Sequence, residues 1–321
     1  MEIKDIKILI VGCGSIGKRH TECLDKIGVR NLVFFDIDTN ISKALAEQYN
    51  GSYADTFEDG VEQADAVYIL SPTKLHIKQA IYAVERKKHV FIEKPISSSL
   101  DGIDELSKLA KANNVVVGNA FCFRFHEGVQ KMKKLIDKGD IGKVISIRAM
   151  MGEHFPTVRP DYMDTYYVKY SGAFELVHDV DLAIYMADQP IQNFSGLYGS
   201  YGNMGFQSPD TVEIILQFEK CLANVHLDFF QKPRTRTLDI LGEKGNLRLE
   251  FADWNKYTIS RYFPDEDMWK DETFETTRND MFVAESMNFL NAILGKEPIA
   301  VPVSEAVKSL KVVNGVYKES C

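Results

Sequence analysis

The first 120 residues alternate between short apolar runs and amphipathic stretches with helical spacing. The apolar runs predict strands at 6–11, 32–35, 52–53, 67–70, 89–92 and 115–117. The intervening helical patterns end at Ile27, Tyr49, Ala83 and Ala112. Short β-rich runs that alternate with helices are typical of a parallel, doubly wound sheet with helices on its faces.

The pattern changes after about residue 120, where strands begin to follow one another without intervening helices. Predicted strands cover 144–150, 193–198, 211–218, 222–230, 237–241, 246–251 and 256–261, and predicted helices cover 129–138, 173–187, 281–294 and 304–318. Runs of strands predict a mostly antiparallel sheet in an α+β domain. We therefore expect two domains, 1–120 and 121–321, as the length of 321 residues also favours.

A glycine-rich turn joins the first predicted strand to the first helix. Its residues are Gly12, Cys13, Gly14, Ser15, Ile16 and Gly17. In this context the glycines permit a tight turn, backbone approach to a pyrophosphate and close helix–strand packing, while the helix N-terminus attracts phosphate. Asp36 ends the second strand, where a carboxylate accepts the ribose hydroxyls of NAD and repels the 2′-phosphate of NADP. The turn predicts an NAD site, with two alternatives: Lys43 restores NADP binding, or the turn binds nothing.

Composition narrows the class of partner. The net charge of −8 and the absence of a basic tract argue against nucleic acid or an anionic membrane. No stretch is long and apolar enough to cross a bilayer, and the N-terminus does not have the pattern of a signal peptide. Five cysteines without CxxC spacing predict reduced thiols in the cytoplasm and no metal site. We expect a small-molecule ligand.

Lys94 stands directly after the apolar strand 89–92, within the sequence Glu93-Lys94-Pro95. A lysine is costly at the end of a buried strand, because its ammonium must stay solvated or paired. The proline lacks a backbone N–H and directs the chain out of the sheet. These residues predict a cation at the sheet edge where open α/β folds bind ligands.

Several motifs, taken together and in order, resemble those of the Gfo/Idh/MocA oxidoreductases, a family that includes inositol 2-dehydrogenase and sugar dehydrogenases. They are the glycine turn, Ser71-Pro72-Thr73 with His76, Glu93-Lys94-Pro95, Arg124-Phe125, Ile141-Gly142-Lys143-Val144 and His178-Asp179-Val180-Asp181. The resemblance covers essentially the whole chain. It implies a Rossmann domain, a second domain for substrate binding with a large, open-faced antiparallel sheet, and a homodimer or homotetramer formed through that sheet.

The resemblance also implies roles for individual residues. Lys94 and His178 carry over as catalytic residues: imidazole titrates near neutral pH and suits a base, and the ammonium suits the developing alkoxide. Relatives place an aspartate four residues before the histidine, where this chain has Phe174. Glu175 lies on the same face of the predicted helix and is a candidate replacement, and Asp181 is a further catalytic candidate. For His178 the alternative is a buried core histidine without a catalytic role. For Glu175 and Asp181 the alternative is a simple salt bridge.

The remaining candidates are binding residues. For the cofactor they are Gly12, Gly14, Ser15, Ile16, Gly17, Asp36, Ser71, Pro72, Thr73, His76, Glu93, Lys94 and Arg124. For a polyhydroxy substrate they are Lys94, Arg124, His154, Arg159, Tyr162 and His178, with Tyr166 and Tyr167 in the same polar and aromatic loop. On the second sheet His226, Asp228, Arg234 and Arg236 either reach the ligand or belong to a subunit interface, and Trp254 and Trp269 are expected to pack.

The predicted activity is NAD-dependent oxidation of a secondary hydroxyl of a sugar, sugar derivative or cyclitol. Two alternatives stay open. One is a glycosidase or lyase that retains NAD and uses transient oxidation. The other is a non-catalytic Rossmann protein that senses NAD(H), although such a sensor needs neither Lys94 nor His178.

Overall fold

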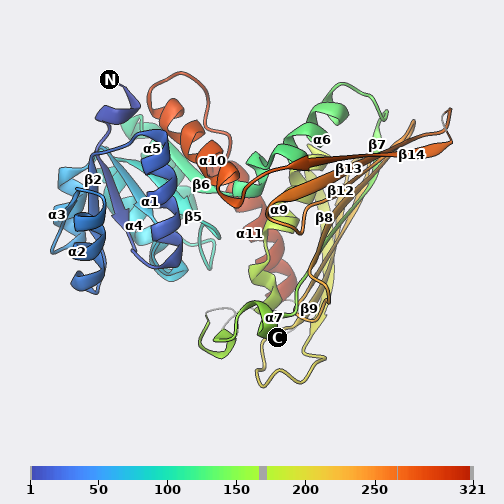
Figure 1. The fold of residues 1–321 in the computed structure, drawn as a ribbon, viewed down its shortest axis with the longest axis horizontal. Coiled ribbons are helices and arrows are strands. Elements are labelled where there is room, and N and C mark those ends of the chain that lie inside the picture. The colour runs from blue at the N-terminus through green and yellow to red at the C-terminus, as the bar shows by residue number, and fades with distance from the viewer. Residues whose placement is uncertain (1, 166–171, 266, 319–321) are drawn as a thin grey trace. The chain divides into compact units, whose positions relative to one another are not determined.

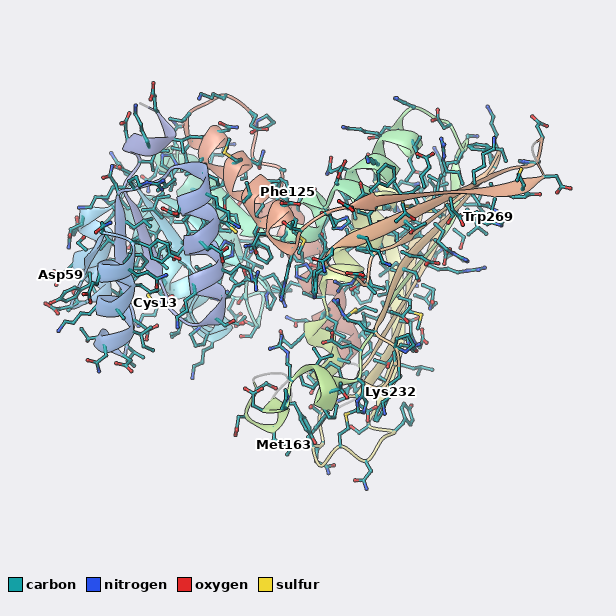
Figure 2. All side chains as sticks on the ribbon, viewed as in Figure 1. Cys13, Asp59, Phe125, Met163, Lys232 and Trp269 are labelled. Atoms are coloured by element: carbon teal, nitrogen blue, oxygen red, sulfur yellow. The ribbon has the colours of Figure 1, made fainter. Side chains whose placement is uncertain are left out.

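The computed structural model describes residues 2–165, 172–265 and 267–318. Contacts between residues divide the chain into two compact units (Figure 1). The first contains residues 1–122 and 279–310, and the second contains residues 123–278 and 311–321. Side chains of both units are drawn in Figure 2, where Cys13 marks the glycine turn of the first and Lys232 marks the β10–β11 connection of the second.

The first unit is built on a six-stranded parallel sheet with the order β3-β2-β1-β4-β5-β6. The strands are β1 (Ile8–Val11), β2 (Leu32–Phe35), β3 (Ser52–Tyr53), β4 (Ala66–Ile69), β5 (His89–Glu93) and β6 (Val117–Ala120). β1 pairs in parallel with both β2 and β4, so the strand order reverses beside β1. Ligands of open α/β sheets bind at the carboxyl ends of strands at such a reversal.

The helices of the first unit follow the predicted alternation. They are α1 (Ser15–Ile27), α2 (Thr39–Gln48), α3 (Phe57–Gln63), α4 (His76–Glu85) and α5 (Ile103–Asn113), with short 3₁₀ turns η1 (Ile3–Asp5) and η2 (Thr73–Leu75). The sequence pattern did not predict α3, because its seven residues contain a central glycine and too few apolar positions to show a period. Residues 115–116 were predicted as strand, but the Val115 N–H bonds to Ala110 O and closes α5.

Residues 279–310, near the C-terminus, also belong to the first unit, whereas Arg278, the first residue of the helix described next, belongs to the second. Helix α10 (Arg278–Ile293), red in Figure 1, buries Phe289 and Leu290 completely in the core of this unit. The Phe289 ring lies 5.5 Å from that of Tyr68 and 5.2 Å from that of Phe91. The sequence pattern had assigned this segment to the second domain, because periodicity identifies a buried face but not the sheet that covers it.

The second unit is built on an eight-stranded sheet with the order β14-β13-β12-β11-β7-β10-β9-β8. The strands are β7 (Val144–Gly152), β8 (Ile191–Gly199), β9 (Thr211–Phe218), β10 (Leu222–Asp228), β11 (Thr235–Gly242), β12 (Asn246–Glu250), β13 (Lys256–Phe263) and β14 (Met268–Glu275). Only β7 and β10 pair in parallel, which confirms the predicted mostly antiparallel sheet. Strand β14 was missed, because nearly all its residues are exposed and its pattern shows no buried face.

One face of this sheet packs against helices α6 (Glu127–Asp137) and α9 (His178–Ala187). Val225 and Leu227 on β10 are fully buried, whereas the alternating His226 is half-buried. Exposed apolar side chains include Ile215 (41% exposed) and Leu222 (53%). The remaining elements are η3 (Cys122–Phe125), α7 (Phe155–Val158), η4 (Tyr162–Asp164), η5 (Gly172–Glu175) and α11 (Val303–Lys318).

Within residues 2–165, 172–265 and 267–318 the structure has neither a membrane-spanning helix nor a metal-binding cluster. No helix there is long and apolar enough to cross a membrane. No group of three or more His, Cys, Asp or Glu side chains there is arranged to hold a metal ion.

Candidate functional site

The glycine turn after β1 has the geometry that a dinucleotide requires. Gly12 adopts a φ of +93°, and a Cβ there would lie 2.7 Å from Leu70 O. A Cβ on Gly17 would collide with Gly12 O, so helix and turn pack backbone to backbone. At Gly14, by contrast, a Cβ would meet nothing within 4 Å. The turn therefore leaves open space at the N-terminus of α1, where a pyrophosphate fits.

Asp36 is tied to this turn by its side chain. Its Oδ2 accepts a 2.7 Å hydrogen bond from the Cys13 backbone N–H, and its Oδ1 accepts from the Asp38 N–H at 3.0 Å. Each carboxylate oxygen keeps capacity for another donor, because an ionised carboxylate has about four acceptor positions. Asp36 thus shapes the turn and remains able to accept ribose hydroxyls.

The neighbouring Ile37 is a residue that sequence reasoning missed. The residue is 98% exposed. The available signal was an apolar residue directly after the acid that ends β2. An exposed apolar side chain beside Asp36 would offer an apolar surface to a bound nucleotide.

His76 connects two of the predicted motifs. The ring is buried, with Nε2 2.8 Å from Ser71 O and Nδ1 3.0 Å from Pro95 O. Burial lowers the pKa of His76, although bonds to both carbonyls oppose this shift. The imidazole therefore ties the turn after β4 to the segment after β5. Within that turn Ser71 Oγ donates to Gln79 at 2.6 Å, Pro72 is exposed and Thr73 is buried.

Glu93 and Lys94 follow one another at the carboxyl end of β5. Lys94 is half-buried. Glu93 Oε2 lies 3.4 Å from Nε2 of the buried His20 on α1. The buried Glu285 on α10 has its pKa raised well above the usual range by burial and by the charge of Glu93. Glu93, predicted to bind the cofactor, thus makes its side-chain contact with α1.

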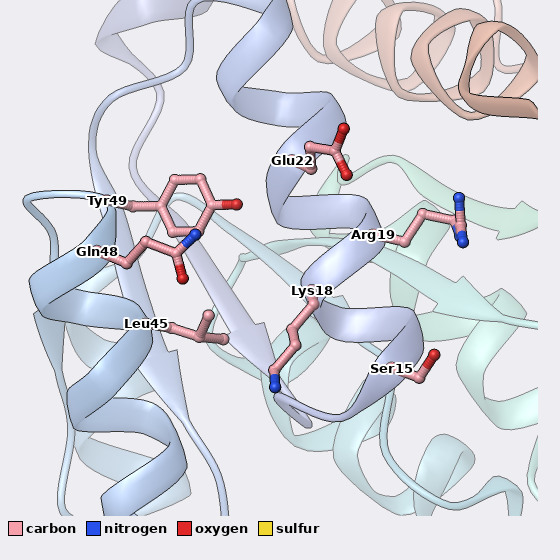
Figure 3. Close-up of a pocket in the computed structure, with 7 residues that line it drawn as sticks. All are labelled: Ser15, Lys18, Arg19, Glu22, Leu45, Gln48 and Tyr49. Atoms are coloured by element: carbon pink, nitrogen blue, oxygen red, sulfur yellow. The ribbon is translucent and has the colours of Figure 1, made fainter. Parts of the chain in front are cut away.

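A polar groove of about 540 Å³ lies between α1 and α2 in the first unit (Figure 3). Its lining residues are Ser15, Lys18, Arg19, Glu22, Leu45, Gln48 and Tyr49. Only Ser15 is shared with the predicted cofactor residues. In Figure 3 Ser15 lies at the start of α1, and the Lys18 ammonium points back along the helix toward the turn before it.

In the second unit His178 is the first residue of α9 and is half-buried. Its ring meets the Phe123 ring edge-to-face, with centroids 4.9 Å apart. Phe123 in turn stacks on Trp254 at 6.1 Å. Sequence reasoning treated Trp254 as a packing residue and did not single out Phe123, because neither motif nor spacing links them to His178.

Two buried ion pairs hold the first turn of α9. Arg124 binds Asp181 with both ends of its guanidinium, Nε to Oδ2 at 2.8 Å and Nη2 to Oδ1 at 2.7 Å. Arg236 Nη2 donates to Asp179 Oδ2 at 2.8 Å. All four side chains are at least 95% buried. The structure therefore pairs Arg124 with Asp181. The sequence had predicted that Arg124 binds cofactor and substrate and that Asp181 is catalytic.

The segment before His178 differs from the prediction of one helix over 173–187. Residues Gly172–Glu175 form the 3₁₀ turn η5, and α9 begins only at His178. Gly172 has a φ of +56°, the Ala173 N–H bonds to Pro209 O, and the Leu176 N–H bonds to Ala173 O in the i→i−3 pattern of a 3₁₀ turn. The argument that Glu175 shares a helix face with His178 is therefore wrong. Glu175 is buried in η5, and Phe174 packs its ring 5.2 Å from Tyr198.

The predicted substrate loop is only partly described, since Tyr166 and Tyr167 lie outside the described residues. His154 Nδ1 lies 2.5 Å from Thr157 Oγ1, at the start of α7. Tyr162 donates its hydroxyl to Met204 O at 3.0 Å, and Arg159 is exposed.

His226, on the sheet of the second unit, lies between two carboxylates. Its Nδ1 is 2.6 Å from Glu213 Oε1 and its Nε2 is 3.0 Å from Asp228 Oδ2. Hydrogen bonds to Asp228 and Glu213 raise the pKa of His226 to about 9. The ring is therefore protonated at neutral pH and does not suit a general base.

Known proteins resemble the chain in both units. Residues 6–121 match the family described as "Oxidoreductase family, NAD-binding Rossmann fold", and residues 129–248 match the "GFO/IDH/MocA C-terminal domain". The uncharacterized oxidoreductase YrbE of Bacillus subtilis is 28% identical over 67% of this chain and 64% of its own length. The match therefore spans less than two thirds of that relative.

A second relative and a solved structure extend the similarity. Myo-inositol 2-dehydrogenase of Thermotoga maritima is 27% identical over 77% of this chain and 75% of its own length. The WlbA dehydrogenase of Bordetella pertussis, solved with NADH and UDP-GlcNAcA, has the same fold with a TM-score of 0.83. That structure is 20% identical and covers 98% of this chain and 95% of its own. With both of its domains matched in order by one family, the chain belongs to the GFO/IDH/MocA oxidoreductases, whose first domain is an NAD-binding Rossmann fold.

Proposed function

We propose that this protein is an NAD-dependent dehydrogenase that oxidises a secondary hydroxyl of a sugar, sugar derivative or cyclitol. The observation that carries the proposal is the placement of Lys94 at the carboxyl end of β5, in the same sheet as a glycine turn with open space at Gly14. The names of the relatives support the substrate class. The T. maritima relative is a myo-inositol 2-dehydrogenase, and WlbA was solved with a nucleotide-linked sugar acid.

In the proposed reaction, different residues hold the cofactor, stabilise the charge on the substrate oxygen and accept its proton. Bound NAD supplies the hydride acceptor. The open turn at Gly14 and the N–H groups at the start of α1 would hold the pyrophosphate, and Asp36 would accept the ribose hydroxyls. The Lys94 ammonium would hydrogen-bond the substrate hydroxyl oxygen and stabilise negative charge as the proton leaves. His178 Nε2 or Nδ1 would accept that proton.

The carboxylates around His178 take revised roles in this proposal. Asp181 is a positioning residue, because both its oxygens bond to Arg124 and hold the first turn of α9. Asp179 does the same through Arg236. Glu175 stays a candidate for the role of the missing aspartate, now from a 3₁₀ turn rather than from the histidine's own helix.

The decisive experiment is a screen for NADH formation. The full chain is incubated with NAD and sugars, cyclitols, their acids and nucleotide-linked forms, and absorbance of NADH is followed. A dehydrogenase gives one NADH for each substrate oxidised. Turnover without net NADH would favour the NAD-retaining glycosidase or lyase, and NAD binding without any turnover would favour a sensor.

Asp36→Ala is expected to weaken NAD binding by about tenfold or more and to reduce discrimination against NADP. The variant loses the ribose acceptor, and it also leaves the Cys13 N–H without its carboxylate. Dissociation constants for NAD and NADP, measured by fluorescence titration, test this expectation. Asp65→Ala is a matched control, since Asp65 Oδ2 accepts the Lys7 backbone N–H at 2.9 Å before β1. Unchanged cofactor selectivity in Asp36→Ala would refute the assignment of Asp36.

We also propose that the protein acts in the cytoplasm as a homodimer or homotetramer. Support for the assembly comes from the sheet of the second unit, which carries the exposed apolar side chains Leu197, Ile215 and Leu222 on neighbouring strands. Association of two such faces would remove these side chains from water.

A further inference from the structure

Three arginines of the second unit converge around Trp254. The Arg234 guanidinium lies over the indole ring at 4.4 Å from its centroid, and that of Arg278 lies over the same ring at 4.3 Å. Arg236 lies over the ring of Phe123, at 4.0 Å, and Phe123 stacks on Trp254. We call Arg234, Arg236 and Arg278 the arginine cluster.

The guanidinium groups are close enough to affect one another. The pKa of Arg234 falls to about 10, first because of burial and next because of the charge of Arg236, with Arg278 adding to the effect. The carboxylates of Glu153 and Asp179 oppose the shift. Arg234 Nε donates to Glu153 Oε2 at 3.1 Å, and the adjacent Asp253 uses its Oδ1 to accept the Asn255 N–H. Convergent cations of this kind lower their mutual repulsion when an anion binds between them.

One buried N–H of the arginine cluster, on Arg236, makes no hydrogen bond within the described residues. Arg236 is 97% buried, and within the described ranges its Nε has no hydrogen-bond partner. A buried, unused guanidinium N–H costs free energy unless an acceptor reaches it. An anionic group or an ordered water is the acceptor that chemistry allows, and the cationic surroundings favour the anion.

The arginine cluster lies next to the proposed base. His178 and Trp254 both contact the phenyl ring of Phe123, with centroids 4.9 Å and 6.1 Å from that of Phe123. Arg236 also binds Asp179, the residue that follows His178 in α9. The arginine cluster and His178 therefore share Phe123 and the first turn of α9 as neighbours.

We propose that the arginine cluster binds a carboxylate or phosphate group on the substrate whose hydroxyl is oxidised at His178. The inference rests on the proposed function and makes it more specific, because it predicts an acidic sugar or a sugar or cyclitol phosphate. The guanidinium is a planar donor that matches both anions.

The test compares matched pairs of neutral and anionic substrates with the full chain and NAD. The pairs are glucose with glucuronate, glucose with glucose 6-phosphate, and myo-inositol with an inositol monophosphate. We expect kcat/KM of one anionic class to exceed that of its neutral parent by at least about tenfold. Comparison of the glucuronate pair with the two phosphate pairs shows whether the site prefers a carboxylate or a phosphate.

Variants connect this preference to the arginine cluster. Arg278→Gln is expected to lower the ratio of anionic to neutral kcat/KM about tenfold, mainly through KM, and Arg278→Lys to restore part of it. Arg278 is exposed, so its replacement leaves the core of the unit intact. Arg261→Gln is the control, since Arg261 pairs with Glu272 between β13 and β14, and it should leave the ratio unchanged.

A binding measurement separates this inference from the proposed function. In a Trp269→Phe background Trp254 is the remaining tryptophan, and its fluorescence is titrated with glucuronate, glucose 6-phosphate and their neutral parent. A saturable change with an anion that Arg278→Gln weakens supports the arginine cluster, even if no compound yields NADH. Equal kcat/KM for neutral and anionic substrates, with no effect of Arg278→Gln, would overturn the inference while the dehydrogenase function stands.

Discussion

Replacement of Lys94 or His178 by alanine is expected to lower kcat at least about a hundredfold while the dissociation constant for NAD changes little. Each replacement removes a group proposed to act on the reacting oxygen: the cation that stabilises its charge, or the base that takes its proton. Neither side chain belongs to the glycine turn or to Asp36, on which the proposed binding of the pyrophosphate and ribose depends. Steady-state kinetics with an accepted substrate and NAD titration by fluorescence measure the two effects separately.

Lys108→Ala controls for the loss of a lysine in the first unit, because Lys108 is an exposed residue of α5. Its kcat should equal that of the unaltered protein. Full turnover by Lys94→Ala or His178→Ala would contradict the proposed mechanism. A loss of NAD affinity as large as the loss of kcat would instead place the replaced residue in cofactor binding.

Asp181→Ala is expected to lower the free energy of unfolding by about 3–5 kcal/mol, since it leaves the buried Arg124 guanidinium without its carboxylate. Arg124 and Asp181 are 5% and 2% exposed, so water does not replace the lost partner without structural change. Urea unfolding followed by fluorescence measures the loss. The double variant Arg124→Met/Asp181→Leu should recover most of the stability, because it removes both charges together.

The matched control is Asp188→Ala at the other end of α9. Asp188 also pairs with a cation, Lys133, at 3.1 Å, but its side chain is 78% exposed. Exposed pairs contribute about 0–1 kcal/mol, and alanine at the positive φ of Asp188 (+48°) costs about 1 kcal/mol more, so this variant should lose clearly less stability than Asp181→Ala. If Asp181→Ala proved as stable as Asp188→Ala yet lost activity, Asp181 would act directly in catalysis and not as a positioning residue.

The features that the sequence predicted well are those that depend on neighbouring residues. The turn from Gly12 to Gly17 needs glycine at defined positions, and each requirement appears in the structure as a positive φ, a close backbone contact or an open space. The strands of both sheets were equally visible. Strands of the first sheet such as β1 and β4 are buried on both faces and appear as continuous apolar runs, whereas strands of the second such as β10 alternate between buried and more exposed residues. The family resemblance rested on such local motifs, and the matches at residues 6–121 and 129–248 confirm it.

Prediction failed where the pattern was short, exposed or broken by a distant contact. Helix α3 and strand β14 have too few buried positions to show a period. The expected helix from Ala173 begins only at His178, and the preceding 3₁₀ turn is held by the bond from the Ala173 N–H to Pro209 O, across more than thirty residues of chain. Hydrogen bonding to a distant segment leaves no trace in the local sequence.

The sequence alone determined the two sheets, the glycine turn with Asp36, and Lys94 at the end of its strand. Tertiary structure decided which charges meet: Arg124 with Asp181, Arg236 with Asp179, and the arginine cluster around Trp254. It also placed α10 in the core of the first unit. The physical reason is the same in each case. Periodicity specifies which face of an element is buried, whereas the partner on that face depends on how the whole chain folds.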